Sequence, residues 1–74
     1  MTQQTFGQKA VGLSFNPSGA SLVDELKTLY AGVIDTLDAF RQNGTPEQKR
    51  LASIAITETQ GAQMWAVKAV TWRD

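Results

Sequence analysis

The stretch SIAITETQGAQMWAVKAVTW, residues 53–72, has the periodicity of a long helix but no fully polar face. One row of this helix, continued back to residue 51, follows the alternating four-and-three spacing of a coiled-coil seam. A helix with so little polar surface must be buried on nearly every side, and a chain of 74 residues cannot cover it alone. The stretch therefore predicts partner chains. This seam row comprises Leu51, Ala55, Glu58, Ala62, Trp65, Ala69 and Trp72, and a second row of mostly apolar or small residues comprises Ala52, Ile56, Thr59, Gln63, Ala66 and Val70.

Glu58 is the one carboxylate in the seam row and predicts a polar contact there. Two interpretations are open. A buried polar residue can set the register of pairing with a partner helix, as asparagine does in coiled coils. Alternatively, the carboxylate contacts a ligand or a cation. Trp65 and Trp72 lie seven residues apart on one face, and their indole N–H groups need partners, which suits an interface between subunits.

The composition limits the ways in which this chain is stabilised. Domains of this size bury little of their surface and rely on disulfides, metals or oligomerisation. The sequence has no cysteine and no histidine, which removes disulfides and argues against transition-metal sites. We therefore expect residues 1–74 to form one small domain that oligomerises and that holds no metal or cofactor.

Seven basic residues balance seven acidic ones, which argues against a broad basic face for duplex nucleic acid. A small anionic ligand needs only a few placed cations and is compatible with this balance. The sequence has no apolar run long enough to span a membrane, and its N-terminus lacks the basic and apolar regions of a signal peptide. We expect a soluble, intracellular protein without a membrane partner.

The N-terminal part of the chain predicts a short helix and a turn. The helix is expected over about residues 3–11, weakened by Gly7 and ended near Gly12. The following run, SFNPSG at residues 14–19, is a turn, because asparagine before proline leaves the helical region and glycine supplies a positive φ.

Two long helices are expected after this turn. The first runs over about residues 22–42 with Ser21 as its N-cap, and Asn43-Gly44 ends it. Thr45 then caps the last helix, with proline at its first position and Gln48 closing a capping box. The fold class is therefore all-α, a short N-terminal helix followed by a long antiparallel αα-hairpin.

Groups that catalyse reactions are nearly absent from the sequence. It has no histidine base, no thiol and no glycine-rich phosphate loop. Asp35 and Asp38 lie three residues apart on the expected second helix, with neighbours typical of a solvated face. The sequence therefore predicts no catalytic residues and no enzyme.

Two lysines and one phenylalanine have settings that fit a ligand site. Lys27 lies beside the apolar stripe of its helix and Lys68 lies within an apolar run, so each side chain either reaches to water or meets an anion. Phe15 lies on the turn among small polar residues. It is either a hydrophobic plug for the N-terminal arm or an aromatic that stacks on a nucleobase.

Two segments, FGQKAVGLSFNPSG at residues 6–19 and RLASIAITETQGAQMWAVKAVTW at residues 50–72, resemble the phage anti-CBASS sponge proteins. Those proteins share a helical-hairpin domain with phage proteins that counter another nucleotide-signalling immune system. The resemblance implies a compact homo-hexamer of hairpins. It also implies binding of cyclic di- and trinucleotides such as cGAMP without cleavage, which keeps CBASS effectors inactive in the cytoplasm of the infected bacterial host.

The resemblance further implies two kinds of ligand site. A cyclic dinucleotide lies between paired protomers under the N-terminal arm, held by an aromatic residue and a lysine. A cyclic trinucleotide lies where several protomers meet, held by a threonine and a basic residue. The matching positions for the first site are Phe15, Asn16, Ser18, Gly19 and Lys27, and those for the second are Thr28 with either Lys68 or Arg73.

A rival interpretation is a helical adaptor that docks its apolar helix on a host protein and inhibits it. The two interpretations differ in their expected response to cyclic nucleotides, which stabilise a sponge and leave an adaptor unchanged. A phosphodiesterase is disfavoured because the sequence lacks the histidine and cysteine that would serve as base, nucleophile or metal ligand.

Overall fold

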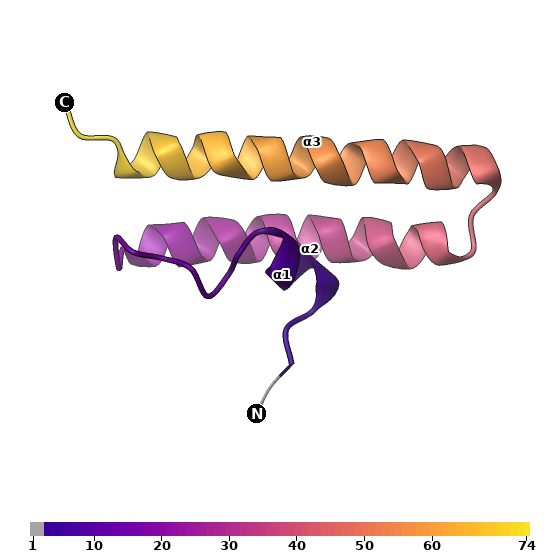
Figure 1. Cartoon of the computed structure of the whole chain (residues 1–74), viewed down its shortest axis with the longest axis horizontal. Coiled ribbons are helices and arrows are strands. Elements are labelled where there is room, and N and C mark those ends of the chain that lie inside the picture. The colour runs from indigo at the N-terminus through magenta and orange to yellow at the C-terminus, as the bar shows by residue number, and fades with distance from the viewer. Residues whose placement is uncertain (1–2) are drawn as a thin grey trace.

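The computed structural model describes residues 3–74 and consists of three helices (Figure 1). The helices are α1 (Phe6–Ala10), α2 (Ser21–Gln42) and α3 (Pro46–Thr71). Helices α2 and α3 run antiparallel as a hairpin, and α1 packs against α2. No strand occurs in the described part of the chain. The predicted all-α class and the αα-hairpin are confirmed, and the first two residues of the predicted domain lie outside the described residues.

Helix α1 is shorter than the predicted range of residues 3–11. Thr5 is its N-cap, and its side chain accepts a hydrogen bond from Gln8 N while Gln8 bonds back to the Thr5 backbone. This capping box starts the helix later than expected. Gly12 has a φ of 64° and ends it, as its conformational freedom predicts.

The prediction that Ser21 is the N-cap of α2 is wrong. Ser21 is the first helical residue, and Ala20 occupies the N-cap position without a side-chain cap. The preceding turn holds the chain there instead, because the Asn16 side chain donates to Ala20 O at 2.9 Å and Ser18 Oγ accepts from Ala20 N at 3.2 Å. Gly19 has the predicted positive φ of 69°.

The predicted start of α3 is confirmed in detail. Thr45 caps the helix by accepting from Gln48 N at 3.2 Å, and the Gln48 side chain accepts from Thr45 N at 2.9 Å. Pro46 occupies the first helical position, where the missing N–H has no intrahelical acceptor to lose.

The core lies where α1 and its following residues meet the hairpin. Ile34 of α2 is fully buried, and Ala31, Val11 and Ile56 pack with it. On α3 the second row faces α2, since its buried residues are Ala52, Ile56 and Gln63. The seam row is therefore not the row that closes the hairpin.

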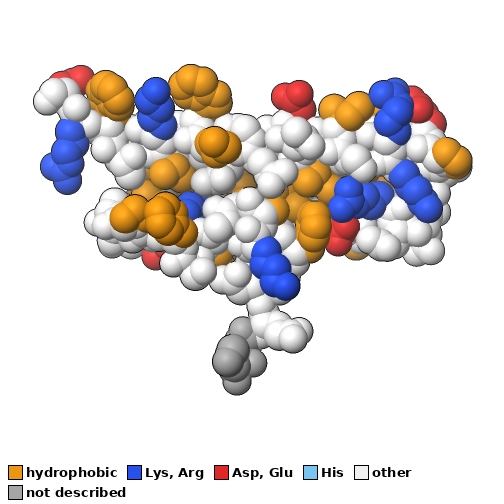
Figure 2. Space-filling view, in the orientation of Figure 1, with side chains coloured by type: hydrophobic (Ala, Val, Ile, Leu, Met, Phe, Trp, Pro, Cys, Tyr) orange, Lys and Arg blue, Asp and Glu red, His pale blue; other side chains and the backbone are white. Residues whose placement is uncertain are grey.

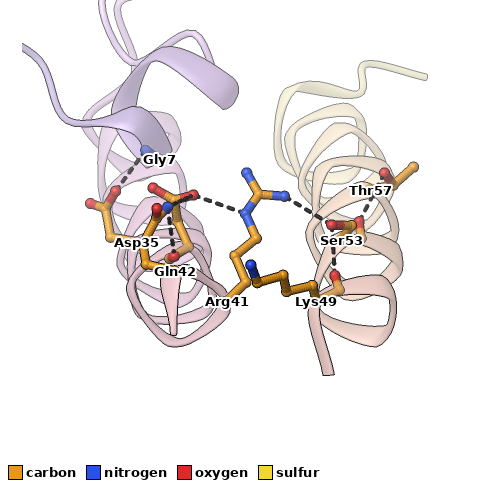
Figure 3. Close-up of polar contacts among 8 residues, drawn as sticks. Gly7, Asp35, Arg41, Gln42, Lys49, Ser53 and Thr57 are labelled. Carbon is orange, nitrogen blue, oxygen red and sulfur yellow. Dashed lines mark hydrogen bonds and ion pairs between the residues drawn. The ribbon is translucent and has the colours of Figure 1, made fainter. Parts of the chain in front are cut away.

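Polar contacts connect the three helices (Figure 3). They show that the prediction of a solvated face at Asp35 and Asp38 is wrong. Asp35 accepts a hydrogen bond from Gly7 N at 2.7 Å, which ties α1 to α2. Asp38 pairs with Arg41 at 2.9 Å, and the same guanidinium donates across the hairpin to Ser53 Oγ at 3.0 Å. Both carboxylates therefore have structural partners.

The seam row of α3 is largely exposed in the single chain. Trp65 and Trp72 retain 71% and 64% of their accessible surface, and Glu58 is also exposed. Figure 2 shows hydrophobic side chains projecting along the edge of α3 that faces away from α2. The predicted partner chains stay a prediction. Within residues 3–74, no helix is long and apolar enough to cross a membrane.

Candidate functional site

The loop between α1 and α2 folds against the end of the hairpin where α2 begins and α3 ends (Figure 1). It encloses a pocket of about 270 Å³ whose walls come from the loop and from both long helices. The walls are mainly apolar, with one lysine among them. The lining residues are Phe15, Asn16, Pro17, Ser18, Val23, Lys27, Val67 and Thr71.

Asn16 organises the loop side of this pocket. Its amide nitrogen donates to Ala20 O at 2.9 Å and to Asp24 Oδ1 at 3.0 Å, and its oxygen accepts from Ser18 Oγ at 2.7 Å and from Gly19 N at 3.2 Å. An asparagine side chain offers two donors and one acceptor oxygen, so all of these groups are engaged by the loop and by the first turn of α2. Asn16 therefore positions the pocket wall.

Lys27 is the buried cation of the site. Only 5% of its surface is accessible, and Nζ donates to Gly12 O at 2.9 Å and to Phe15 O. The side chain thus neither reaches freely to water nor meets a carboxylate. It fastens the loop to α2 through two backbone carbonyls. An ammonium group has three N–H donors, so two hydrogen bonds leave one donor for another acceptor.

The Phe15 ring lies over this buried ammonium while remaining open to solvent. The distance from Lys27 Nζ to the ring centroid is 5.6 Å, within the range of a cation–π contact. The side chain retains 70% of its accessible surface, so it does not act as the hydrophobic plug considered above. A planar ring and a cation at the same pocket wall form a surface that suits an aromatic, anionic ligand.

The structure brings together four of the five positions implied for the dinucleotide site. Phe15, Asn16, Ser18 and Lys27 all line the pocket, whereas Gly19 is not among its lining residues and supplies the positive φ of the turn. Sequence reasoning missed the opposite wall, which includes Val67 and Thr71. These residues continue the buried face of α3 from Gln63, and this helical spacing was the available signal.

The three positions implied for the trinucleotide site are not brought together within one chain. Thr28 is exposed on α2. Lys68 Nζ lies over two indole rings, 5.2 Å from the Trp65 centroid and 5.6 Å from that of Trp72. Arg73 and Ser18 line a separate depression between the loop and the C-terminal end of the chain. A site built from these residues requires more than one protomer.

The described residues hold no group of three or more histidine, cysteine, aspartate or glutamate side chains that could bind a metal ion. The pocket also has no acid–base pair among its lining residues. What the pocket offers a ligand is an exposed aromatic ring, apolar walls and a single buried positive charge.

The family model for the Acb2/Tad1 hairpin domain matches residues 8–71, well over half of the chain. No curated protein and no solved structure matched the chain. The matched range covers the pocket loop, both long helices and every implied site residue except Arg73. The family comprises phage anti-CBASS and anti-Thoeris sponges, which bind cyclic nucleotide signals. This chain belongs to the Acb2/Tad1 hairpin domain family.

Proposed function

We propose that this chain sequesters cyclic di- and trinucleotide messengers such as cGAMP without cleaving them, and so blocks CBASS effector activation in the cytoplasm of the infected bacterial host. In this proposal the protein acts as a homo-oligomer, a hexamer by its resemblance to the family. The observation that carries the dinucleotide part is the buried Lys27 ammonium beside the exposed Phe15 ring, in a pocket formed by the N-terminal loop.

Charge is the first argument for an anionic ligand. Burying an ammonium group is costly unless it is paired or well hydrogen-bonded. Among residues 3–74, no carboxylate lies within ion-pair distance of Lys27, and two backbone carbonyls are its hydrogen-bond partners. A phosphate oxygen that accepts the third N–H would both neutralise this charge and complete its hydrogen bonding.

The pocket size and its apolar walls are the second argument. Ligand sites usually measure about 300–1,000 Å³, so about 270 Å³ accommodates one part of a cyclic dinucleotide. Such a ligand has two bases and two phosphates, and two symmetry-related pockets would each take one base and one phosphate. Phe15 would stack on the base while Lys27 approaches the phosphate. The proposed site is thus shared by two protomers.

Calorimetric titration with 3′,3′-cGAMP tests the dinucleotide site. Phe15→Leu removes the ring but leaves the backbone carbonyl that Lys27 holds. Stacking contributes about 1–3 kcal/mol per base and the shared site loses both of its Phe15 rings, so the dissociation constant should rise at least about 30-fold. Phe40→Leu is the matched control, because Phe40 is also exposed and lies on α2 away from the pocket. Equal affinities of the two variants would contradict the stacking role of Phe15.

Lys27→Met retains most of the side-chain length without the charge and is expected to abolish dinucleotide binding. Mass spectrometry of the nucleotide released by denaturing the complex tests sequestration, and intact cGAMP is the expected product. A linear dinucleotide would establish cleavage. Failure of the unmodified protein to bind any cyclic di- or trinucleotide would refute the sponge function.

A cyclic trinucleotide would bind at a separate site between protomers. Thr28 would contribute from α2, together with Lys68 or Arg73 from other protomers. Thr28→Val is expected to weaken cyclic trinucleotide binding and to spare cGAMP, because Thr28 is not among the lining residues of the loop pocket. A parallel loss for both ligands would place Thr28 in a general structural role.

A further inference from the structure

The exposed face of α3 has a regular alternation of large and small side chains. Along the seam row, every seventh residue from position 55 to 69 is alanine, and the residues between and beyond them are large. The alanines are Ala55, Ala62 and Ala69, and the large residues are Leu51, Glu58, Trp65 and Trp72. The large residues are all exposed in the single chain, so this row does not contribute to the core formed by residues 3–74.

Depressions along this face have the geometry of coiled-coil holes. One of about 370 Å³ is lined by Trp65, Lys68 and Ala69 of α3 and by its C-cap residue Trp72, at the spacing i, i+3, i+4 and i+7. A coiled-coil knob inserts into a hole formed by four residues of the facing helix. Here alanine forms the floor, two indoles form the walls, and the Lys68 ammonium lies over both rings. The matching knob is therefore a large residue with negative charge.

We infer that a second copy of this chain packs its α3 antiparallel against this face, with Glu58 of each copy inserted into the Ala69 hole of the other. This inference deepens the homo-oligomer of the proposed function and rests on it for the presence of a second copy. The carboxylate of one chain then meets the Lys68 ammonium of the other.

The rest of the face fits the same register. In antiparallel helices, moving seven residues forward on one chain moves seven residues back on the other. Trp65 therefore lies opposite Ala62 of the second copy, and Trp72 lies opposite Ala55. Glu58, Trp65 and Trp72 each meet an alanine of the second copy.

Gly61 supports this register independently. Glycine in a helix interior is destabilising relative to alanine, and a Cβ added to Gly61 would meet no other part of residues 3–74 within 4 Å, its own helical turn apart. No close contact among the described residues therefore requires a glycine at this position. In the proposed register it lies beside Ala62, where it makes room for the Trp65 indole of the second copy.

Two alternative pairings fail on charge, and the first of them also fails on size. A parallel, in-register pair places alanine against alanine, indole against indole and Glu58 against Glu58. An antiparallel pair shifted by one heptad inserts Glu58 into a hole that contains Glu58 of the second copy. Both arrangements bring like charges together, which opposes association. The Glu58–Lys68 register is the one that pairs opposite charges.

Charge reversal tests this arrangement by sedimentation equilibrium. Glu58→Lys and Lys68→Glu each place like charges in the hole and should raise the dissociation constant about tenfold or more. The double variant restores an opposite pair in reversed order and should recover association. Residues 58 and 68 are about 15 Å apart along one helix, so such rescue reports contact between chains. No weakening by either single variant, or no recovery in the double variant, would overturn the inference.

Disulfide trapping provides a second measurement on a chain that has no cysteine of its own. The variant Glu58→Cys/Ala69→Cys should form covalent dimers on mild oxidation, because each cysteine faces the other position of the second copy. Either single cysteine variant serves as the control and should stay uncrosslinked. Dimers from the single variants would indicate parallel pairing, and a monomeric unmodified protein that captures a host protein instead would support the adaptor. Either result overturns the inference.

The ligand measurements separate this inference from the proposed function. If the double variant recovers association but the protein binds no cyclic nucleotide, the α3 interface is supported and the sponge function is refuted. If the protein binds cGAMP but the double variant does not recover association, the sponge function is supported and this interface is refuted. Because the inferred contact engages Lys68 with Glu58, it leaves Arg73 as the basic residue for a trinucleotide site.

Discussion

Replacing Gly7 with alanine is expected to lift α1 away from α2. The glycine lies where the two helices cross, and an added Cβ would overlap the Ala31 carbonyl oxygen and lie 2.9 Å from Asp35 Oδ1. The Ala31 carbonyl is part of the α2 backbone and cannot rotate away. Helix α1 must therefore move, and the hydrogen bond from Gly7 N to Asp35 at 2.7 Å must lengthen or break.

The expected loss of stability follows from these two effects. A hydrogen bond to a charged group contributes about 1.5–3 kcal/mol, and overpacking of a close contact typically costs about 1–3 kcal/mol. The two costs overlap, because lifting α1 relieves the steric contact as it breaks the bond. We expect the free energy of unfolding to fall by about 2–3 kcal/mol.

Urea denaturation followed by circular dichroism measures this change, at one fixed protein concentration because oligomerisation affects apparent stability. Gly32→Ala is the matched control, since Gly32 lies on α2 and its added Cβ would meet nothing within 4 Å. The control should gain up to about 1 kcal/mol. If Gly7→Ala is as stable as Gly32→Ala, the close α1–α2 contact described above is wrong.

Three further changes probe separate parts of the fold. Ile34→Ala removes a fully buried side chain at the centre of the core and should lower the free energy of unfolding by about 2–5 kcal/mol in the same urea assay. Thr45→Ala removes the cap of α3 and should cost about 1 kcal/mol, whereas Thr45→Ser should restore it. A hydrogen bond from Arg50 lowers the pKa of Glu47 in the folded protein. The pair therefore stabilises the fold at pH values above the unfolded-state pKa of Glu47. This contribution is lost as the pH falls through the lower pKa of the folded state. Because both side chains are exposed, Glu47→Gln should change the midpoint only slightly at pH 7 and not at all at low pH, and a large effect at pH 7 would contradict the exposed geometry.

The hairpin could be predicted from local signals because each helix carries its own start and stop. Asn43-Gly44 and the Thr45 capping box act through neighbouring backbone groups, and their effect does not depend on distant residues. The resemblance of two segments to the sponge family was likewise readable, and the family match over residues 8–71 confirms it. The error at Ser21 arose because the Asn16 turn, rather than the helix cap, organises that end.

Tertiary structure alone decided what the buried and polar residues do. Periodicity identified two rows on α3 but could not say which row faces α2, because both are largely apolar and the choice depends on packing between helices. The sequence indicated that Asp35 faces solvent, whereas in the folded chain Gly7 N of α1 donates a hydrogen bond to its carboxylate. Lys27 meets carbonyls from a loop 12 to 15 residues earlier in the chain, a contact that spacing along one helix does not encode. Contiguous residues were thus enough to predict the helices, the start of α3 and the family. The pocket and the burial of its lysine depend on contacts between segments distant in sequence, and only the folded chain decided them.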